Sequence, residues 1–231
     1  MLRETDISAK KVEQAKTIFA GREGSLTKIT TLFFDVGGVI LTNGWDTVAR
    51  RAAIAKFHLD FAEFEKRHEL ANPAWERGEI SLEEYLARTI FYSERKFSAR
   101  EFEEFMYAQS QALPESLELV RGIACSRQCF MAVISNESAE INAYRIQKFG
   151  LRGMFAAFFS SCYVGIQKPD VRIFQMALNV TQRRPDECIF VDDRAENVEG
   201  ARKAGMNGIH FQNVAQFSAE LKKLGVQVTA S

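Results

Sequence analysis

The chain has 231 residues, of which 46% are hydrophobic and 26% charged, and its 30 basic and 30 acidic residues cancel. This length can bury one sizeable core, or a core with a smaller lid, and the balanced charge excludes the basic surface typical of proteins that bind nucleic acid or anionic membranes. No apolar run approaches the ~20 residues of a membrane span, and four scattered cysteines make no disulfide scaffold, so we expect a cytoplasmic protein with reduced thiols.

The N-terminal part of the chain is predicted to form a helical extension over residues 1–29. Its residues 6–20 place apolar side chains at helical spacing, and a Gly/Ser joint follows. The first strand is the apolar run Leu32–Phe34, which ends in Asp35 and is followed by Gly37 and Gly38. Such a strand is typical of a sheet that is buried on both faces.

Residues 42–112 contain no strand-like run and are predicted to form a helical cap inserted after the first strand. Phe57, Phe61 and Phe64 recur at helical spacing, and the pairs Ser81/Glu84 and Ser98/Glu101 are typical of capping boxes. A block of this length is too long for a simple crossover between two strands.

The remainder of the chain alternates between helices and short apolar strands, which indicates an α/β fold with a parallel sheet covered on both faces. Residues 30–41 and 113–231 are predicted to form this core domain. The predicted elements are helix Glu115–Gly122, strand Phe130–Ile134, helix Glu137–Phe149, the apolar run Phe155–Phe159, helix Asp170–Asn179, strand Ile189–Val191, helix Glu196–Ala204, strand Gly208–Phe211 and helix Ala215–Leu224.

Polar residues follow several predicted strands at the point where each strand ends. Asp35 follows the first strand, Ser135 and Asn136 follow the second, and Asp192 with Asp193 follow the run CIFV. Ligands of open parallel sheets bind outside the carboxyl ends of the strands, so these side chains should converge on one crevice. The segment GIQKPD adds Lys168 just before a predicted helix, and a cation there would compensate the adjacent carboxylates.

This order of motifs resembles the four motifs of the haloacid dehalogenase (HAD) superfamily. VGIQKPDVRIF and IFVDDRAENVEGARKAGM are similar to the third and fourth motifs of its phosphatase branch, and the helical insertion resembles the small caps of that branch. The resemblance covers about residues 30–225. It implies a Rossmann-like sheet with a cap and a Mg²⁺-dependent hydrolase of small phosphorylated metabolites.

The resemblance also implies roles for individual residues. Asp35 would be the nucleophile that becomes an aspartyl phosphate, and Lys168 would neutralise the charge around it. Ser135 and the backbone amide of Asn136 would bind phosphate oxygens. The implied Mg²⁺ ligands are Asp35, the carbonyl of Gly37 and Asp193, with Asp192 more distant or bridged by water. The residue chemistry agrees, because a carboxylate needs cations to approach a phosphate dianion, and oxygen atoms are the ligands that Mg²⁺ prefers.

The chain departs from the family pattern at Gly37, where most of these phosphatases carry a second aspartate as general acid and base. Such a group is typically worth ~10²–10⁴-fold in rate. Three interpretations remain open: a phosphatase without that acid, as in members resembling sugar-1-phosphate phosphatases that carry glycine there; a 2-haloacid dehalogenase, whose halide leaves unprotonated; and a non-catalytic phosphate-binding or regulatory protein. We expect open space beside Gly37, next to Val39, and a steep dependence of rate on the leaving group unless a cap residue or a substrate hydroxyl supplies the proton.

Substrate choice is expected to depend on the cap and on the loop that leads into it. Trp45 and Asp46 are our candidates for substrate binding, because they follow the first strand closely. Further candidates are Asn43, His68, Trp75 and Tyr92, although tryptophan and tyrosine at such positions more often belong to a cap core, and a histidine is more often a surface or capping residue. The predicted partner is a small-molecule phosphate, with no nucleic acid or membrane, and the sequence leaves monomer and homodimer open.

Overall fold

The computed structural model of the protein describes residues 28–227. The predicted N-terminal helix, and most of the extension over residues 1–29, lie outside the described residues. Within the described part, no helix is both long and apolar enough to cross a membrane.

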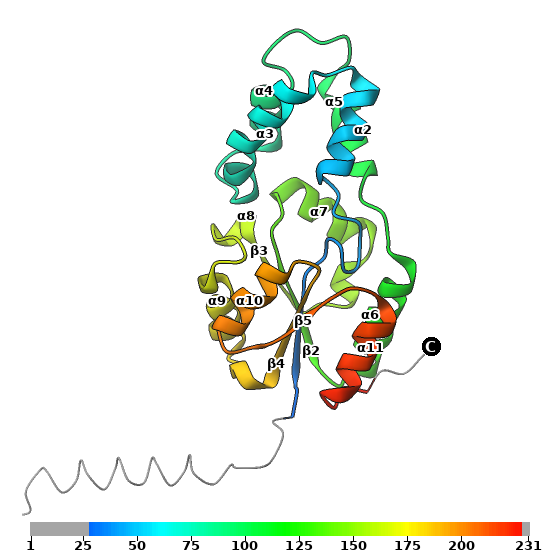
Figure 1. Ribbon diagram of the computed structural model, residues 1–231, viewed down its shortest axis with the longest axis vertical. Coiled ribbons are helices and arrows are strands. Elements are labelled where there is room, and N and C mark those ends of the chain that lie inside the picture. Colours follow the sequence, from blue (N-terminus) through cyan, green and yellow to red (C-terminus); the bar gives the residue numbers. More distant parts are fainter. Residues whose placement is uncertain (1–27, 228–231) are drawn as a thin grey trace, which may run out of the picture.

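A five-stranded parallel sheet in the order β3-β2-β1-β4-β5 forms the centre of the fold (Figure 1). The strands are β1 (Thr31–Phe34), β2 (Phe130–Ser135), β3 (Ala157–Ser160), β4 (Cys188–Asp192) and β5 (Asn207–His210). Phe34 of β1 lies opposite Val133 of β2 and Val191 of β4, so the residue after β1 comes level with the end of β4. This register aligns the strand ends that carry the polar residues.

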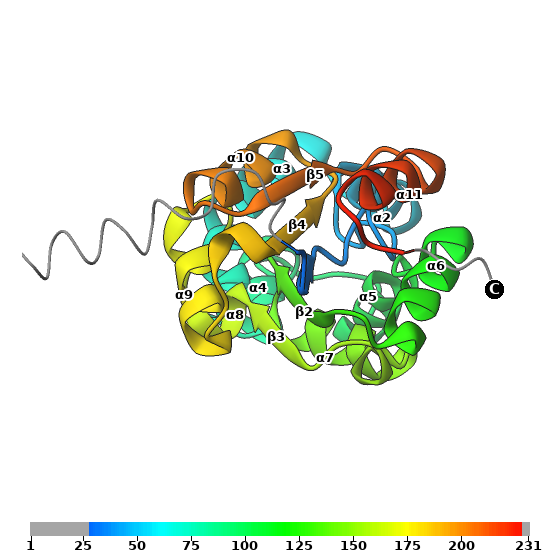
Figure 2. The same cartoon turned by 90° about the horizontal axis from the view of Figure 1, so that it is seen from below.

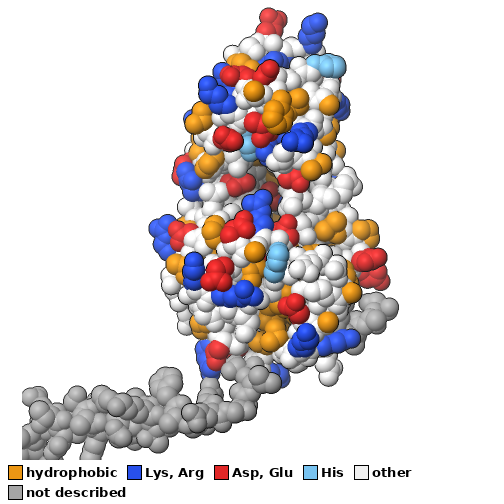
Figure 3. All heavy atoms as spheres, in the orientation of Figure 1, with side chains coloured by type: hydrophobic (Ala, Val, Ile, Leu, Met, Phe, Trp, Pro, Cys, Tyr) orange, Lys and Arg blue, Asp and Glu red, His pale blue; other side chains and the backbone are white. Residues whose placement is uncertain are grey.

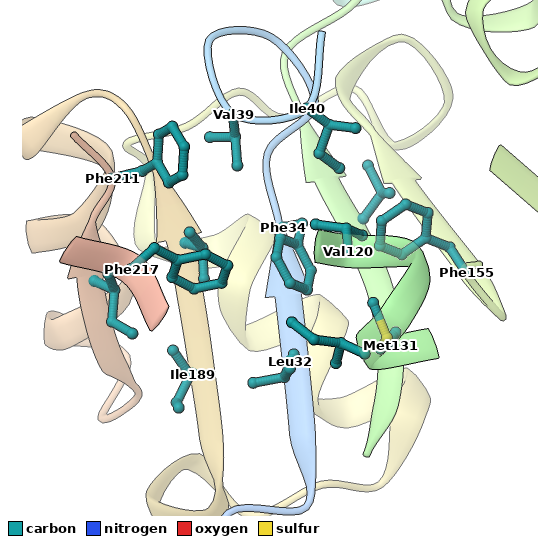
Figure 4. Close-up of a cluster of buried hydrophobic side chains, with 14 of the residues drawn as sticks. Leu32, Phe34, Val39, Ile40, Val120, Met131, Phe155, Ile189, Phe211 and Phe217 are labelled. Carbon is teal, nitrogen blue, oxygen red and sulfur yellow. The ribbon is translucent and has the colours of Figure 1, made fainter. Parts of the chain in front are cut away.

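The sheet is covered on both faces, as the strand composition predicts (Figure 2). Phe34 and its neighbours Leu32, Met131 and Ile189 pack on one face with helices α6 and α11, as Figure 4 shows. Phe33, Ala132 and Phe190 pack on the other face with α9 and α10. All four residues of β1 are buried, which is expected for a strand between two helical layers.

The helices of the core follow the predicted order. They are α6 (Pro114–Ser126), α7 (Ala139–Lys148), α8 (Ser161–Val164), α9 (Val171–Thr181), α10 (Ala195–Lys203) and α11 (Val214–Lys223), with short 3₁₀ turns at η1 (Leu151–Gly153) and η2 (Pro185–Glu187). The observed bounds differ from the predicted ones by a few residues. The predicted α/β fold with a parallel sheet and a helical insertion is confirmed.

The insertion consists of α2 (Thr47–Phe57), α3 (Phe61–Glu76), α4 (Leu82–Thr89) and α5 (Ala99–Ala108), which lie beyond the carboxyl ends of the strands (Figure 1). They enclose a core of their own around Trp75, Tyr85 and Phe102. Ser98 and Glu101 form the predicted capping box of α5. Ser81 caps α4, but its predicted partner Glu84 pairs with Arg88 instead.

One carboxylate of the core holds the cap over the sheet. Glu140 of α7 accepts hydrogen bonds from Trp75 Nε1 at 3.2 Å and from the backbone N–H of Leu82 at 2.8 Å. Glu140 therefore binds both α3 and α4 of the cap, and this contact orients the cap face that looks toward the strand ends.

Candidate active site

Residues from three strand ends and one loop meet at the edge of the sheet beneath the cap. Asp35 follows β1, Ser135 ends β2, and Asp192 with Asp193 stand at the end of β4. Lys168 reaches them from the loop between α8 and α9. Carboxylate oxygens of Asp35, Asp192 and Asp193 lie within 4.8 Å of one another. The predicted convergence therefore occurs.

Lys168 lies between two of these carboxylates. Its Nζ is 2.9 Å from Asp35 Oδ1 and 2.7 Å from Asp192 Oδ2, and its side chain is 1% exposed. Burial raises the pKa of Asp35 to about 6, and the charge of Asp192 adds to that rise while Lys168 opposes it. Burial opposes the charge of Lys168, but the two carboxylates outweigh it and raise the pKa of the ammonium.

The side chain of Asn136 holds the loop that carries Lys168. Its Nδ2 donates to the Lys168 carbonyl at 2.9 Å, and its Oδ1 accepts from the Lys168 N–H at 2.8 Å. The predicted phosphate contact of Asn136 uses the backbone amide instead, and it stays a prediction. The Ser135 hydroxyl, from the preceding residue, is buried and has no hydrogen-bond partner among the described residues.

The acidic cluster contains oxygens without partners, which is what a cation site requires. Asp193 Oδ1 is buried with no partner in the described part of the chain, and Asp35 Oδ2 has none there either. Asp192, by contrast, is bonded to Lys168, to Asn197 Nδ2 and to the N–H of Arg194. Asp35 and Asp193 therefore suit direct contact with a hard cation, while Asp192 suits a supporting role.

Gly38 allows the Asp193 carboxylate to lie against the loop that follows β1. Its φ is +68°, and a Cβ at this position would come 2.1 Å from Asp193 Oδ2. The hydrogen bonds that close this loop use the carbonyls of Val36 and Leu41, and none among the described residues uses the Gly37 carbonyl. That carbonyl is available as the predicted cation ligand.

The expectation of open space beside Gly37 is wrong. A Cβ on Gly37 would come 2.7 Å from Asn43 Oδ1, because the Asn43 side chain turns back over the loop. Asn43 Nδ2 also donates to Asp193 Oδ2 at 3.2 Å. The position where the family's second aspartate would project is thus occupied by a neutral amide.

A cavity of about 300 Å³ lies between this cluster and the cap. In Figure 3, acidic and basic side chains gather between the upper and lower parts of the molecule, where its surface is hollowed. The cavity is lined from the cap side by Trp45, Asp46, Thr47, Arg50, His68, Asn72, Trp75 and Glu76, and from the core side by Asp35, Gly37, Asn43, Asn136, Glu137, Ser138, Ile141, Arg145, Lys168, Arg194 and Asn197.

The predicted substrate-binding residues Trp45 and Asp46 both line this cavity. Asp46 also caps α2, where its side chain accepts from the Ala49 N–H. Tyr92 is a wrong candidate, because its ring lies under Arg67, is 40% exposed and does not line the cavity.

His68 contributes a neutral hydrogen-bond donor to the cavity wall. Trp45 Nε1 donates to the Tyr85 hydroxyl at 2.9 Å, and this hydroxyl lies 2.8 Å from His68 Nδ1. Since an indole only donates, the hydroxyl proton is available to Nδ1, and the imidazole proton is then on Nε2. Burial lowers the pKa of His68 to about 4, so the ring is neutral at neutral pH. No described residue accepts from Nε2.

Two partly buried carboxyl groups in the cavity wall were not predicted. Glu137 pairs with Arg145 at 2.6 Å, and burial raises the pKa of Glu137 to about 7. Burial also raises the pKa of Glu76, the last residue of α3. The sequence did carry a signal for Glu76: His68, Asn72 and Glu76 recur every four residues, which places polar groups along one face of a helix.

Comparisons with known proteins agree with this geometry. Residues 29–205 match the family model of the haloacid dehalogenase-like hydrolases. The chain is 28% identical over 211 residues to flavin mononucleotide hydrolase 1 of Arabidopsis thaliana, which covers 87% of this chain and 80% of that protein. It is 31% identical over 114 residues to phosphoserine phosphatase of Thermus thermophilus, covering 48% and 46% of the two chains.

Solved structures show the same fold. A HAD family enzyme from Bacteroides thetaiotaomicron, in complex with magnesium and inorganic phosphate, superposes with a TM-score of 0.66 at 19% identity and covers 78% of this chain and 93% of its own. The L-2-haloacid dehalogenase PA0810 superposes with a TM-score of 0.56 at 14% identity and covers 78% and 83%.

Gly38→Ala should weaken divalent-cation binding about 10-fold or more, because the new methyl group displaces the Asp193 carboxylate. Gly165→Ala is the matched control, since Gly165 has nearly the same φ of +69° but nothing within 4 Å of the added Cβ. Both variants carry the left-handed strain of about 1 kcal/mol. Cation affinity measured by calorimetry distinguishes them, and equal affinities in the two variants would contradict the proposed cation site.

His68→Gln should reduce the loss of stability in acid. The unfolded imidazole has a pKa near 6.5 and the folded one about 4, so between these values the unfolded chain binds more protons and the free energy of unfolding rises with pH. His68 contributes up to about 3 kcal/mol to that rise. Urea unfolding from pH 4 to 7 measures it, with His58→Asn removing an exposed imidazole as control. If the free energy of unfolding of His68→Gln had the same slope against pH as that of the parent, folding would not lower the pKa of His68, and the neutral imidazole would be contradicted.

Proposed function

The chain belongs to the haloacid dehalogenase-like hydrolases and is a phosphatase of that type, and we propose that it hydrolyses small, hydroxyl-rich phosphomonoesters by covalent catalysis at Asp35. The observation that carries this proposal is the set of unpartnered polar atoms around Asp35. Ser135 Oγ and Asp193 Oδ1 are buried without partners in the described residues. Leaving buried polar atoms unpaired is costly, so such atoms are expected where a ligand supplies the missing contacts.

The chemistry starts with attack of an Asp35 oxygen on phosphorus. The new bond gives an aspartyl phosphate, and the bond from phosphorus to the leaving oxygen breaks. The Lys168 ammonium and the Ser135 hydroxyl would donate to phosphoryl oxygens, on which negative charge is concentrated. Water then attacks phosphorus, releases inorganic phosphate and restores the Asp35 carboxylate.

The donor set around Asp35 fits magnesium. Asp35, the Gly37 carbonyl and Asp193 offer oxygen ligands, and Asn43 orients the Asp193 carboxylate. Magnesium bound there would supply positive charge between the Asp35 carboxylate and the phosphoryl group. The unpartnered oxygens of Asp35 and Asp193 are also difficult to reconcile with a haloacid dehalogenase, which needs no metal.

The lining of the cavity supports a small polar leaving group. Asp46, His68 and Asn72 present hydrogen-bonding groups from the cap, and few apolar side chains line the cavity beyond two indole rings and Ile141. A volume of about 300 Å³ suits a molecule such as a sugar phosphate better than the broad, largely apolar ring system of flavin mononucleotide. This proposal therefore differs from the substrate named for the Arabidopsis relative.

A panel of phosphomonoesters tests the proposal. With Mg²⁺ we expect sugar phosphates to be hydrolysed with a higher kcat/KM than flavin mononucleotide, and we expect EDTA or Asp35→Asn to abolish phosphate release. Asp186→Asn is the control substitution, because Asp186 lies in η2, at the end of β4 opposite the cavity.

Three outcomes would contradict the proposal. Preference for flavin mononucleotide would refute the substrate class, and phosphate release that persists in EDTA would refute the cation site. Chloride release from 2-chloropropionate, without hydrolysis of any phosphate, would identify a dehalogenase.

A further inference from the structure

The leaving oxygen needs a proton that the loop after β1 does not supply. Gly37 has no side chain, and the group that occupies the space beside it, the Asn43 amide, does not release a proton at neutral pH. Alkoxide leaving groups depart slowly unless an acid protonates them. If the proposed function holds, another side chain of the cavity wall supplies this proton.

The direction of attack restricts where that side chain lies. Displacement at phosphorus is in line, so the leaving oxygen is on the side of phosphorus opposite Asp35. Asp35 stands at the edge of the sheet, and α2 and α3 of the cap lie beyond that edge (Figure 1). The leaving group therefore points toward the cap.

Outside the Asp35, Asp192 and Asp193 cluster, three carboxyl groups line the cavity, namely those of Asp46, Glu76 and Glu137. Asp46 accepts the Ala49 N–H and so caps the start of α2. Glu137 follows Ser135 and Asn136 on the core side and pairs with Arg145 at 2.6 Å. Neither therefore combines a position in the cap with freedom from a helix-capping or ion-pairing role.

Glu76 has both properties. It ends α3 in the cap, and no Lys, Arg or His nitrogen among the described residues lies within salt-bridge distance of it. Its Oε2 accepts from Gln167 Nε2 at 2.6 Å, and its carboxyl group also bonds to the Asn72 side chain, so both hydrogen-bond partners are neutral amides. A carboxyl group that is buried with neutral partners favours its protonated form.

Burial and the cationic groups that face Glu76 act in opposite directions. Burial raises the pKa of Glu76, whereas Arg194 at the start of α10 and Lys168 before α9 lower it. Glu76 in turn raises the pKa of Glu137, after β2, by like-charge repulsion. Arg77, its neighbour, is engaged with Glu79. Burial is the largest of these influences, and the pKa of Glu76 is raised above its ordinary value.

We propose that Glu76 is the general acid and base of this enzyme, taking over from the cap the role that Gly37 leaves vacant in the core. As the Asp35 oxygen bonds to phosphorus, the Glu76 O–H transfers its proton to the departing oxygen, and the alcohol leaves neutral. In the second step the Glu76 carboxylate accepts a proton from the water that attacks the aspartyl phosphate. Glu76 is thus protonated again when inorganic phosphate forms.

Gln167 links this acid to the phosphate-binding lysine. It bonds to Glu76 and directly precedes Lys168, whose Nζ contacts Asp35. The Glu76 carbonyl also accepts from the Ser161 hydroxyl of α8. These hydrogen bonds hold α3 against the core, so the same contacts position the Glu76 carboxyl group and the Lys168 ammonium.

The test compares two substrates in each variant. In Glu76→Gln the kcat/KM for an alkyl phosphate should fall about 10²–10⁴-fold, because kcat/KM reports the first step, in which the leaving group departs. The kcat/KM for 2,4-dinitrophenyl phosphate, whose leaving group needs no proton, should change little. The ratio of the two rates in one preparation does not depend on the folded fraction. Glu79→Gln, which removes an exposed carboxylate from the turn that follows the same helix, should leave the ratio unchanged.

The pH dependence of hydrolysis provides a second test, because a purely structural role of Glu76 would not change it. For the alkyl phosphate, the rate of the parent enzyme should fall as pH rises through the pKa of Glu76. Glu76→Asp should keep this fall, and Glu76→Gln should lose it. Equal losses of kcat/KM on both substrates, which leave the ratio unchanged, would overturn the role of Glu76. Failure of the parent to hydrolyse 2,4-dinitrophenyl phosphate with Mg²⁺ would instead overturn the proposed function itself.

Discussion

One buried ammonium holds this site together. Lys168 Nζ lies within 2.9 Å of Asp35 and 2.7 Å of Asp192, in a place that water barely reaches. Removing the ammonium would leave two uncompensated carboxylates, and breaking a buried pair of this kind typically costs about 3–5 kcal/mol. The rest of the site follows from this requirement: β1 and β4 must be neighbours in register, and Asn136 must clamp the lysine loop so that the ammonium reaches both carboxylates.

The cap completes what the core lacks. The core supplies the carboxylates and the groups that we propose bind phosphate, but its loop after β1 carries glycine where most of these phosphatases have an aspartate. The wall opposite is built from α3, whose polar residues His68, Asn72 and Glu76 face the cavity, and Glu140 seats that helix on the core. In our proposal, α3 of the cap therefore both selects the leaving group and protonates it. In a phosphatase with the second aspartate, the core would supply that acid.

The sequence allowed the core site to be predicted because its position follows from local rules. Alternation of helices and apolar strands implies a parallel sheet, and strand ends in such a sheet meet at one edge, so Asp35 and Asp193 had to be close. The cap was harder. Spacing by four residues marks one helix face but does not say what that face meets, and the turn of Asn43 back over Gly37 depends on tertiary packing. Tyr92 was misjudged for the same reason, since aromatic residues at helical spacing do not reveal which of them reach a cavity.

Covalent catalysis at Asp35 is the central claim, and trapping the intermediate tests it most directly. Sodium borohydride reduces an aspartyl phosphate to homoserine, so quenching the enzyme with borohydride during turnover and mapping its peptides by mass spectrometry would identify the residue that carries the phosphoryl group. The account predicts homoserine at position 35, only when substrate and Mg²⁺ are both present. Turnover without any reduced residue, or reduction at another carboxylate, would contradict it.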